Sequence, residues 1–391
     1  MFNDARVYLA IMMYMFGGVF MMVFNFVEMY RMRVQEMNED RANAKWRGLI
    51  LLALPADEES IADAALPAKH ERLLLRKLKN ATTLINFANA LTYFKEKRDI
   101  TAVYGNYMQL LGKTDVFQQL AFKYRSAKVE ERAYFAYFIS LFPEVAGEGY
   151  SNLLNLLVDY IRRSNIYCRT NVVKALCHIG NPTAVVKALD VIDGMNLYMN
   201  SRFLADELMA FRGDKEALAL FLWDKHQVWN PTTMVAVVTY INMTTDAFRE
   251  VFMPVLLDER NDMELRIAII RYYRKYKHQP VRDVLIRYLT EAGNINLSIV
   301  SAHALSSYPG EETTAALNAT LRSSNWHLRY NSAINLVDLG TATGDMEMLT
   351  SVDDRYAKEI IHYMMQLRNL VPTKDETESA KEGVTPSAAV S

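Results

Sequence analysis

Basic and aromatic side chains gather in one short stretch of the chain. Residues 271–278 read RYYRKYKH, and Arg282 follows a few residues later. On an α-helix, residues three and four positions apart share a face, so Arg271, Arg274, Lys275 and His278 would point the same way. Guanidinium groups grip phosphate or carboxylate in pairs of hydrogen bonds, and aromatic faces stack on cations and planar ligands. The stretch therefore predicts a site for an anion or for a partner, with these candidate residues: Arg271, Arg274, Lys275, Tyr276, His278 and Arg282.

The same residues also fit a purely structural role. Basic side chains near the end of a helix complement the negative end of its dipole, and tyrosines pack between neighbouring helices. Replacing Arg271, Arg274 and Lys275 with glutamate separates the two interpretations, since a binding site would be lost without loss of helix.

Other residue patterns for chemistry are missing from the sequence. It contains no His-Glu-x-x-His, no phosphate-binding loop, no Gly-x-Gly-x-x-Gly and no Gly-x-Ser-x-Gly. The adjacent carboxylates Asp353 and Asp354 would point apart on a helix. We therefore expect no enzyme, no catalytic residue, no cofactor and no metal, and an active site could only be assembled from separate segments. The histidines fall singly, without the four-residue spacing of a helical metal site; they are His70, His178, His226, His278, His303, His327 and His362.

Composition limits the possible partners and the compartment. Hydrophobic residues make up 51% of the 391 residues, enough for a substantial core, and the formal net charge is −1. A nucleic-acid-binding chain normally carries a strongly basic face, so we expect no nucleic acid. The two cysteines, Cys168 and Cys177, would lie about 13 Å apart on one helix, beyond disulfide reach. Free thiols suit a reducing compartment.

A repeat of about 32 residues must position these side chains. One position recurs at intervals of 31 to 37 residues, and a large apolar residue follows it seven residues later. Four residues after it the side chain is usually small or β-branched, with Asp206 as the exception. This spacing predicts an apolar helical stripe, followed each time by a turn and a second helix. The recurring residues are Arg132, Arg169, Arg202, Met234, Arg266, Ser298 and Arg329.

Two of these segments resemble HEAT repeats. They are residues 169–182, RTNVVKALCHIGNP, and residues 325–340, NWHLRYNSAINLVDLG. The resemblance implies an all-α fold, an α-solenoid of helix pairs, and a role in binding proteins. In HEAT families the recurring arginine commonly pairs with an acidic residue just upstream, and Asp262 is placed to serve Arg266. The second helices, which would line a long groove, are expected at 182–192, 215–225, 247–257, 281–289 and 311–322.

The N-terminal run VYLAIMMYMFGGVFMMVFNFV, residues 7–27, contains no charged residue. As a helix it would be about 31 Å long, which matches the hydrocarbon core of a bilayer. Only Arg6 precedes it, whereas Arg31, Arg33, Arg41, Lys45 and Arg47 follow it. The positive-inside rule therefore predicts a single-pass protein of the cell membrane with its large C-terminal part in the cytoplasm.

These features divide the chain into five expected parts. They are a transmembrane anchor at 1–30, a juxtamembrane stalk and first helix at 31–68, a degenerate N-terminal helical cap at 69–128, a HEAT-like solenoid at 129–370 and a disordered tail at 371–391. Within the second part, Trp46 and the apolar run 49–54, which Pro55 ends, are expected as the first helix that docks on the solenoid.

The preferred functional hypothesis is a membrane-anchored scaffold whose cytoplasmic solenoid binds a membrane-associated protein. At the level of fold, such chains resemble accessory subunits of bacterial envelope and exopolysaccharide export machinery, so a glycosyltransferase or a transporter is the expected partner. The alternative is a regulatory sensor whose basic and aromatic cluster binds a phosphorylated small molecule or an anionic lipid. An enzyme resembling the lyases and glycosylases built on helical repeats comes third.

Overall fold

The computed structural model describes residues 2–55, 64–97, 100–147, 151–291, 293–343, 355–368 and 370. These residues form helices and no strand, which confirms the predicted all-α class. The pair Asp353 and Asp354 and the predicted tail 371–391 lie outside the described residues. The chain divides into two compact units, Met1–Val191 and Ile192–Ser391.

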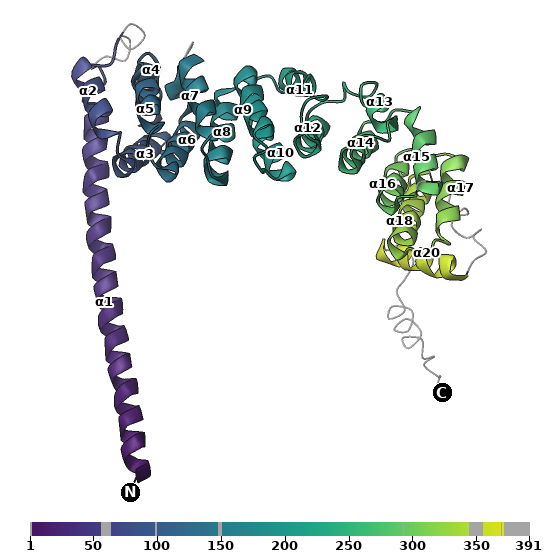
Figure 1. Ribbon diagram of the computed structural model, residues 1–391, viewed down its shortest axis with the longest axis horizontal. Helices are drawn as coiled ribbons and strands as arrows, with labels where there is room; N and C mark the ends of the chain where they lie inside the picture. Colours follow the sequence, from purple (N-terminus) through teal and green to yellow (C-terminus); the bar gives the residue numbers. More distant parts are fainter. Residues whose placement is uncertain are drawn as a thin grey trace, which may run out of the picture. The chain divides into compact units, whose positions relative to one another are not determined.

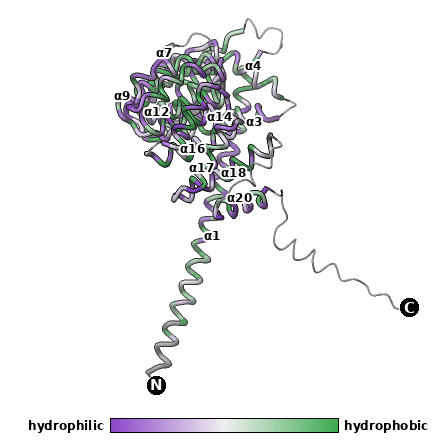
Figure 2. The backbone as a smooth tube through the Cα atoms, turned by 90° about the vertical axis from the view of Figure 1, so that its right-hand side faces the viewer, coloured by the Kyte–Doolittle hydropathy of each residue, from purple (hydrophilic) through white to green (hydrophobic). Residues whose placement is uncertain are grey.

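The first helix, α1, runs unbroken over Phe2–Leu51 (Figure 1). Within the described part of the chain it is the one helix long and apolar enough to cross a membrane, and its apolar window makes no buried contact. Hydrophobic residues follow one another along this window (Figure 2). The predicted separate helix at 49–54 is wrong, because these residues form the last turn of α1 and the connection after it.

The C-terminal end of α1 is part of the core of the first unit. Trp46 and Ile50 are buried, and the ring of Trp46 lies edge-on to Phe87 of α3 with the centroids 5.1 Å apart. The guanidinium of Arg47 lies 4.3 Å from the ring centroid of Tyr93, also on α3. The aromatic contacts of Trp46 and Arg47 therefore fix the C-terminal end of α1 against α3.

The rest of the first unit consists of short helices around an aromatic core. Phe117, Phe135 and Phe138 are buried and stack with neighbouring rings. The helices are α2 Ala68–Lys77, α3 Ala81–Glu96, α4 Thr101–Gly112, α5 Val116–Tyr124, α6 Val129–Leu141, α7 Ser151–Ile161, α8 Ile166–Ile179 and α9 Pro182–Gly194, with a 3-10 turn, η3, at Pro143–Ala146. Cys168 and Cys177 are buried free thiols of α8, and burial raises the pKa of Cys168 to about 11.

In the second unit the helices pack as consecutive pairs, and one member of each pair also packs on its counterparts. Helix α10 contacts α12, which contacts α14, followed by α16, α18 and α20 (Figure 1). The second members of the pairs are α11, α13, α15 and α17. The bounds are α10 Ser201–Met209, α11 Lys215–Trp223, α12 Pro231–Thr244, α13 Phe252–Leu257, α14 Met263–Lys275, α15 Val281–Thr290, α16 Ile295–Leu305, α17 Glu311–Thr320, α18 Trp326–Thr343 and α20 Arg355–Leu367.

The recurring position has a consistent structural role. It is the fourth residue of its helix, and its backbone N–H donates to the residue that precedes the helix. Where it carries a polar side chain, that side chain donates to a backbone carbonyl of a neighbouring helix or turn. Ser298 reaches Tyr288 O of the preceding helix α15 at 2.9 Å, whereas Arg132 reaches Arg163 O, which follows α7, at 2.6 Å. The recurring side chains thus satisfy carbonyls that the ends of helices leave without partners.

Two expectations about this position are wrong. In α10 the fourth residue is Leu204, which is buried, whereas Arg202 is exposed; counted from Leu204, the residue four positions later is the buried Leu208 and not the exposed Asp206. Asp262 is not the partner of Arg266, because its carboxylate caps α14 by accepting from the backbone N–H groups of Glu264 and Leu265. Arg266 donates instead to Leu256 O at 3.2 Å.

Candidate functional site

A groove on the second unit collects three of the predicted site residues. Arg271, Arg274 and Lys275 lie on the last two turns of α14, and all three are exposed. Helices α12 and α16 flank them, and the groove has a volume of about 620 Å³. We call it the basic groove; it is lined by Asn242, Arg271, Arg274, Lys275, Val300, His303, Ala304 and Ser307.

The backbone around the basic groove is held by hydrogen bonds between neighbouring pairs. Lys275 Nζ donates to Asn242 O at 2.8 Å, and Ser307 Oγ donates to Arg274 O at 2.8 Å. Both bonds join residues 33 positions apart, close to the repeat length. The period therefore brings corresponding positions of successive helix pairs side by side.

The cations of the basic groove are not neutralised by acidic side chains. Among the described residues, no carboxylate lies within 4 Å of Arg271, Arg274 or Lys275. The ten ion pairs found among those residues all involve other side chains. Lys275 also lies 4.6 Å above the ring centroid of Tyr276. Three unneutralised cations on one face of a helix give a positive potential that attracts anions.

The structure separates the other predicted residues from this groove. Helix α14 ends at Lys275, so His278 leaves the common face; its ring stacks on Tyr273 and its Nδ1 lies 3.6 Å from Glu250 Oε1. Arg282 pairs with Asp283 and with Glu312. The predicted shared face of Arg271, Arg274, Lys275 and His278 is therefore wrong for His278, and Tyr276 and Arg282 do not line the groove either.

The tyrosines beside the cations have structural roles. Tyr272 and Tyr273 are buried, and Tyr272 Oη accepts from the backbone N–H of Phe248 at 3.0 Å. Tyr273 Oη donates to Arg249 O at 2.6 Å. Burial raises the pKa of Tyr272 to about 12, so its phenol stays neutral. For these two rings, packing between helices is the better interpretation.

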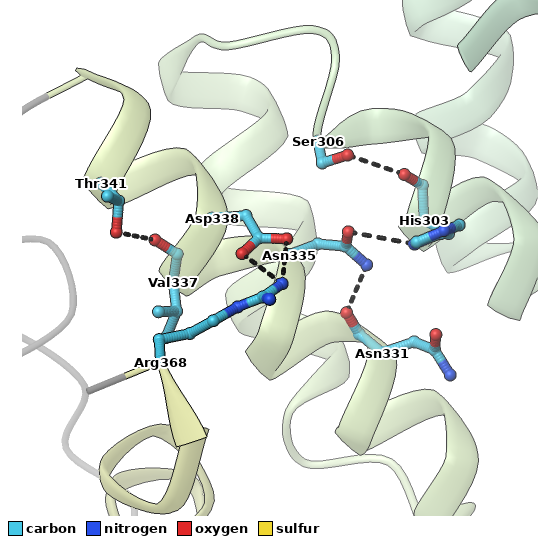
Figure 3. Close-up of polar contacts among 8 residues, drawn as sticks. All are labelled: His303, Ser306, Asn331, Asn335, Val337, Asp338, Thr341 and Arg368. Atoms are coloured by element: carbon cyan, nitrogen blue, oxygen red, sulfur yellow. Dashed lines mark hydrogen bonds and ion pairs between the residues drawn. The ribbon is translucent and has the colours of Figure 1, made fainter. Parts of the chain in front are cut away.

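Sequence reasoning missed Asn242 of α12, His303 of α16 and Ser307 in the turn after α16. These residues could have been found by moving one repeat length forward or backward in the sequence from each cation, because Arg271 and His303 are 32 residues apart. His303 is half-buried, and its Nδ1 lies 3.3 Å from Asn335 Oδ1 of α18 (Figure 3).

Exposed apolar residues on the second helices do not form a continuous surface. Leu220 and Phe221 of α11 are exposed, as are Val251 and Leu257 at the two ends of α13. No large apolar side chain is exposed on the described residues of α15 or α17. A long apolar groove along the second helices, which would favour a protein partner there, is therefore not found.

The chain is thus an all-helical protein of packed consecutive helix pairs with one long apolar N-terminal helix. A scan of protein-family models and a search of curated proteins both return no match to it. Candidate metal sites of three or more histidine, cysteine, aspartate or glutamate side chains do not occur among the residues that the structure describes.

Proposed function

We propose that this chain is a single-pass membrane protein whose helix pairs form a HEAT-like α-solenoid that holds a membrane-associated partner protein. The observation that carries the proposal is α1, which is apolar at one end and built into the core of the first unit at the other. A helix that joins a span to a folded body without a break holds that body close to the bilayer.

Tethering favours binding over catalysis as the role of such a body. Confinement near the membrane raises the effective concentration of any partner in the same membrane, so modest affinity suffices. The excess of basic residues after residues 7–27 supports a cytoplasmic body. A glycosyltransferase or transporter of an exopolysaccharide or envelope complex is the partner class that the fold-level resemblance suggests.

A second candidate function is regulation by an anion. The basic groove favours it, because Arg271, Arg274 and Lys275 have no carboxylate partner among the described residues. A phosphorylated small molecule or an anionic lipid headgroup would satisfy these cations and could alter the packing of α12, α14 and α16.

Two measurements test the first proposal. Carbonate extraction should leave the full chain in the membrane fraction and release a variant that lacks residues 2–30. Crosslinking in native membranes, followed by mass spectrometry, should then recover a membrane protein with the full chain only. If the released variant alone turned over a substrate, or if it recovered the same partner as the full chain, the scaffold proposal would be rejected.

A further inference from the structure

His303 lies at the edge of the basic groove with its proton position set by a neighbour. Asn335 Nδ2 donates to Asn331 O at 2.5 Å, which leaves the amide oxygen of Asn335 facing His303 (Figure 3). This oxygen accepts only, so Nδ1 of His303 carries the proton and donates at 3.3 Å.

The second ring nitrogen of His303, Nε2, is then the atom whose protonation can change. In the neutral imidazole, Nε2 has a lone pair and cannot donate to an anion. It points away from Asn335 (Figure 3). Protonation at Nε2 converts this acceptor into a charged donor, next to a groove that already contains three cations.

Burial and the neighbouring charges together lower the pKa of His303. Burial and then the positive charge of Arg274 lower the pKa of His303, while the hydrogen bond that His303 donates to Asn335 and the charge of Asp338 raise it by less. Asp338 comes from α18 and is paired at 2.8 Å with Arg368, the residue after the end of α20. Helix α15 also packs on α16 but contributes no charge that acts on His303. An anion near Arg274 would offset that positive charge and favour protonation.

We propose that the basic groove binds a phosphate group through Arg271, Arg274 and Lys275, and that His303 takes up a proton from solvent at Nε2 as the anion binds. This inference rests on the second candidate function and adds its ligand chemistry and its pH dependence. A dianion matches several cations better than a single carboxylate does, and guanidinium groups hold phosphate oxygens in pairs. No covalent bond forms or breaks.

The test uses the full chain in neutral detergent micelles and inorganic sulfate as the probe. Sulfate stays a dianion from about pH 5.5 to about pH 8, whereas an ordinary histidine titrates in this range. Calorimetry should show binding about tenfold tighter at the lower pH, because a charged hydrogen-bond donor is added. His303→Gln should bind as the wild type does at the higher pH and lose the pH dependence.

Two further variants locate the effect. Arg274→Gln should weaken sulfate binding about tenfold or more. Arg322→Gln is the matched control: Arg322 is exposed in the same unit but does not line the groove, so affinity and pH dependence should stay unchanged.

The possible failures are distinguishable. Sulfate binding that is equal at both pH values would overturn the proton uptake and leave the anion-binding groove intact. Binding at neither pH would overturn the groove function as well, and binding that Arg274→Gln does not change would overturn its location.

The source of the phosphate group is decided by competition. Glycerol phosphate should displace sulfate from the micellar protein if the ligand is a small molecule. If the ligand is a lipid headgroup, lipid nanodiscs containing phosphatidic acid should block sulfate, and phosphatidylcholine nanodiscs should not. Displacement by none of these would overturn the phosphate assignment.

Discussion

Two open grooves, one in each unit, differ in how their charges are balanced. The groove between α5 and α7 is lined by amides, by Phe122 and Leu156, and by the charged residues Lys123, Arg125 and Asp159. There Arg125 Nε lies 2.6 Å from Asp159 Oδ2, so this one positive charge is neutralised, whereas Lys123 has no carboxylate within 4 Å among the described residues. In the basic groove no described carboxylate reaches the cations. The hollow shape is shared, and the basic groove differs in holding three cations without a described carboxylate partner, which is why we propose it as the binding site.

Helix α14 shows the same contrast between two arginines. Arg266 is buried, donates to Leu256 O, and lies 5.1 Å from the ring centroid of Tyr288. Arg271, just over one turn later, is exposed and has no hydrogen bond or ion pair among the described residues. One arginine stabilises the packing of helices, and the other is available to a ligand.

The largest effect should come from reversing the charge of the basic groove. Arg271→Glu, Arg274→Glu and Lys275→Glu together should lower sulfate affinity by more than about 100-fold, because three attractions become repulsions. Circular dichroism and the unfolding midpoint should stay close to those of the wild type, since all three side chains are exposed. Retained sulfate binding would show that the groove is not the site.

Removing the buried arginine should affect stability instead. Arg266→Leu should lower the free energy of unfolding by about 2 kcal/mol, because Leu256 O loses a charged donor. Arg271→Leu should change it by no more than about 0.5 kcal/mol. Urea unfolding of both variants checks this, and equal destabilisation would contradict the assigned roles.

Removing the carboxylate of Asp159 from the groove between α5 and α7 should give that groove unneutralised arginines like those of the basic groove. Asp159 holds Arg125 and lies 3.5 Å from Arg162, so Asp159→Asn should leave two arginines unneutralised. Weak sulfate binding should then appear in a chain that also carries the triple glutamate change. The cost in stability should be below about 1 kcal/mol because the pair is partly exposed. Absence of binding would mean that unneutralised charge alone does not make a site.

The smallest effect concerns pH and stability. Burial and Arg274 lower the pKa of His303 in the folded state, so the unfolded chain binds this proton more readily. The stability that neutral His303 contributes is fully present above the ordinary histidine pKa of about 6.5. This stability is lost as the pH falls through the lower pKa that His303 has in the folded chain. His303→Gln should therefore unfold with a slightly weaker dependence on acid, measured by thermal melts. A stronger dependence would contradict the direction of the shift.

Most of the helices followed from the sequence because apolar spacing records which face is buried. The second helix expected at 281–289 is α15, Val281–Thr290, and the one expected at 311–322 is α17, Glu311–Thr320. The error at Arg202 has a physical cause. The recurring position lies four residues after the residue that caps the helix, which in α10 is Asn200, so it is Leu204. Arg202 lies two residues before Leu204 and matched the spacing of the repeat by coincidence.

The candidate site was predicted in part. A run of cations on one helix is visible in a sequence, so Arg271, Arg274 and Lys275 were found. The end of α14 at Lys275, and the acidic partners Glu250 and Glu312 of His278 and Arg282, depend on contacts between helices that local spacing does not encode. His303 was dismissed as a single histidine because its neighbours come from other repeats.

The most direct test of the account is a photocrosslinking residue at Ser307, inside the basic groove, in the full chain in native membranes. We expect an adduct with a membrane component, and we expect the triple glutamate change to abolish it while an identical probe at Asn155 in the first groove yields none. An adduct of equal yield with and without the three cations would contradict the claim that a tethered, unneutralised groove is what this protein uses to bind.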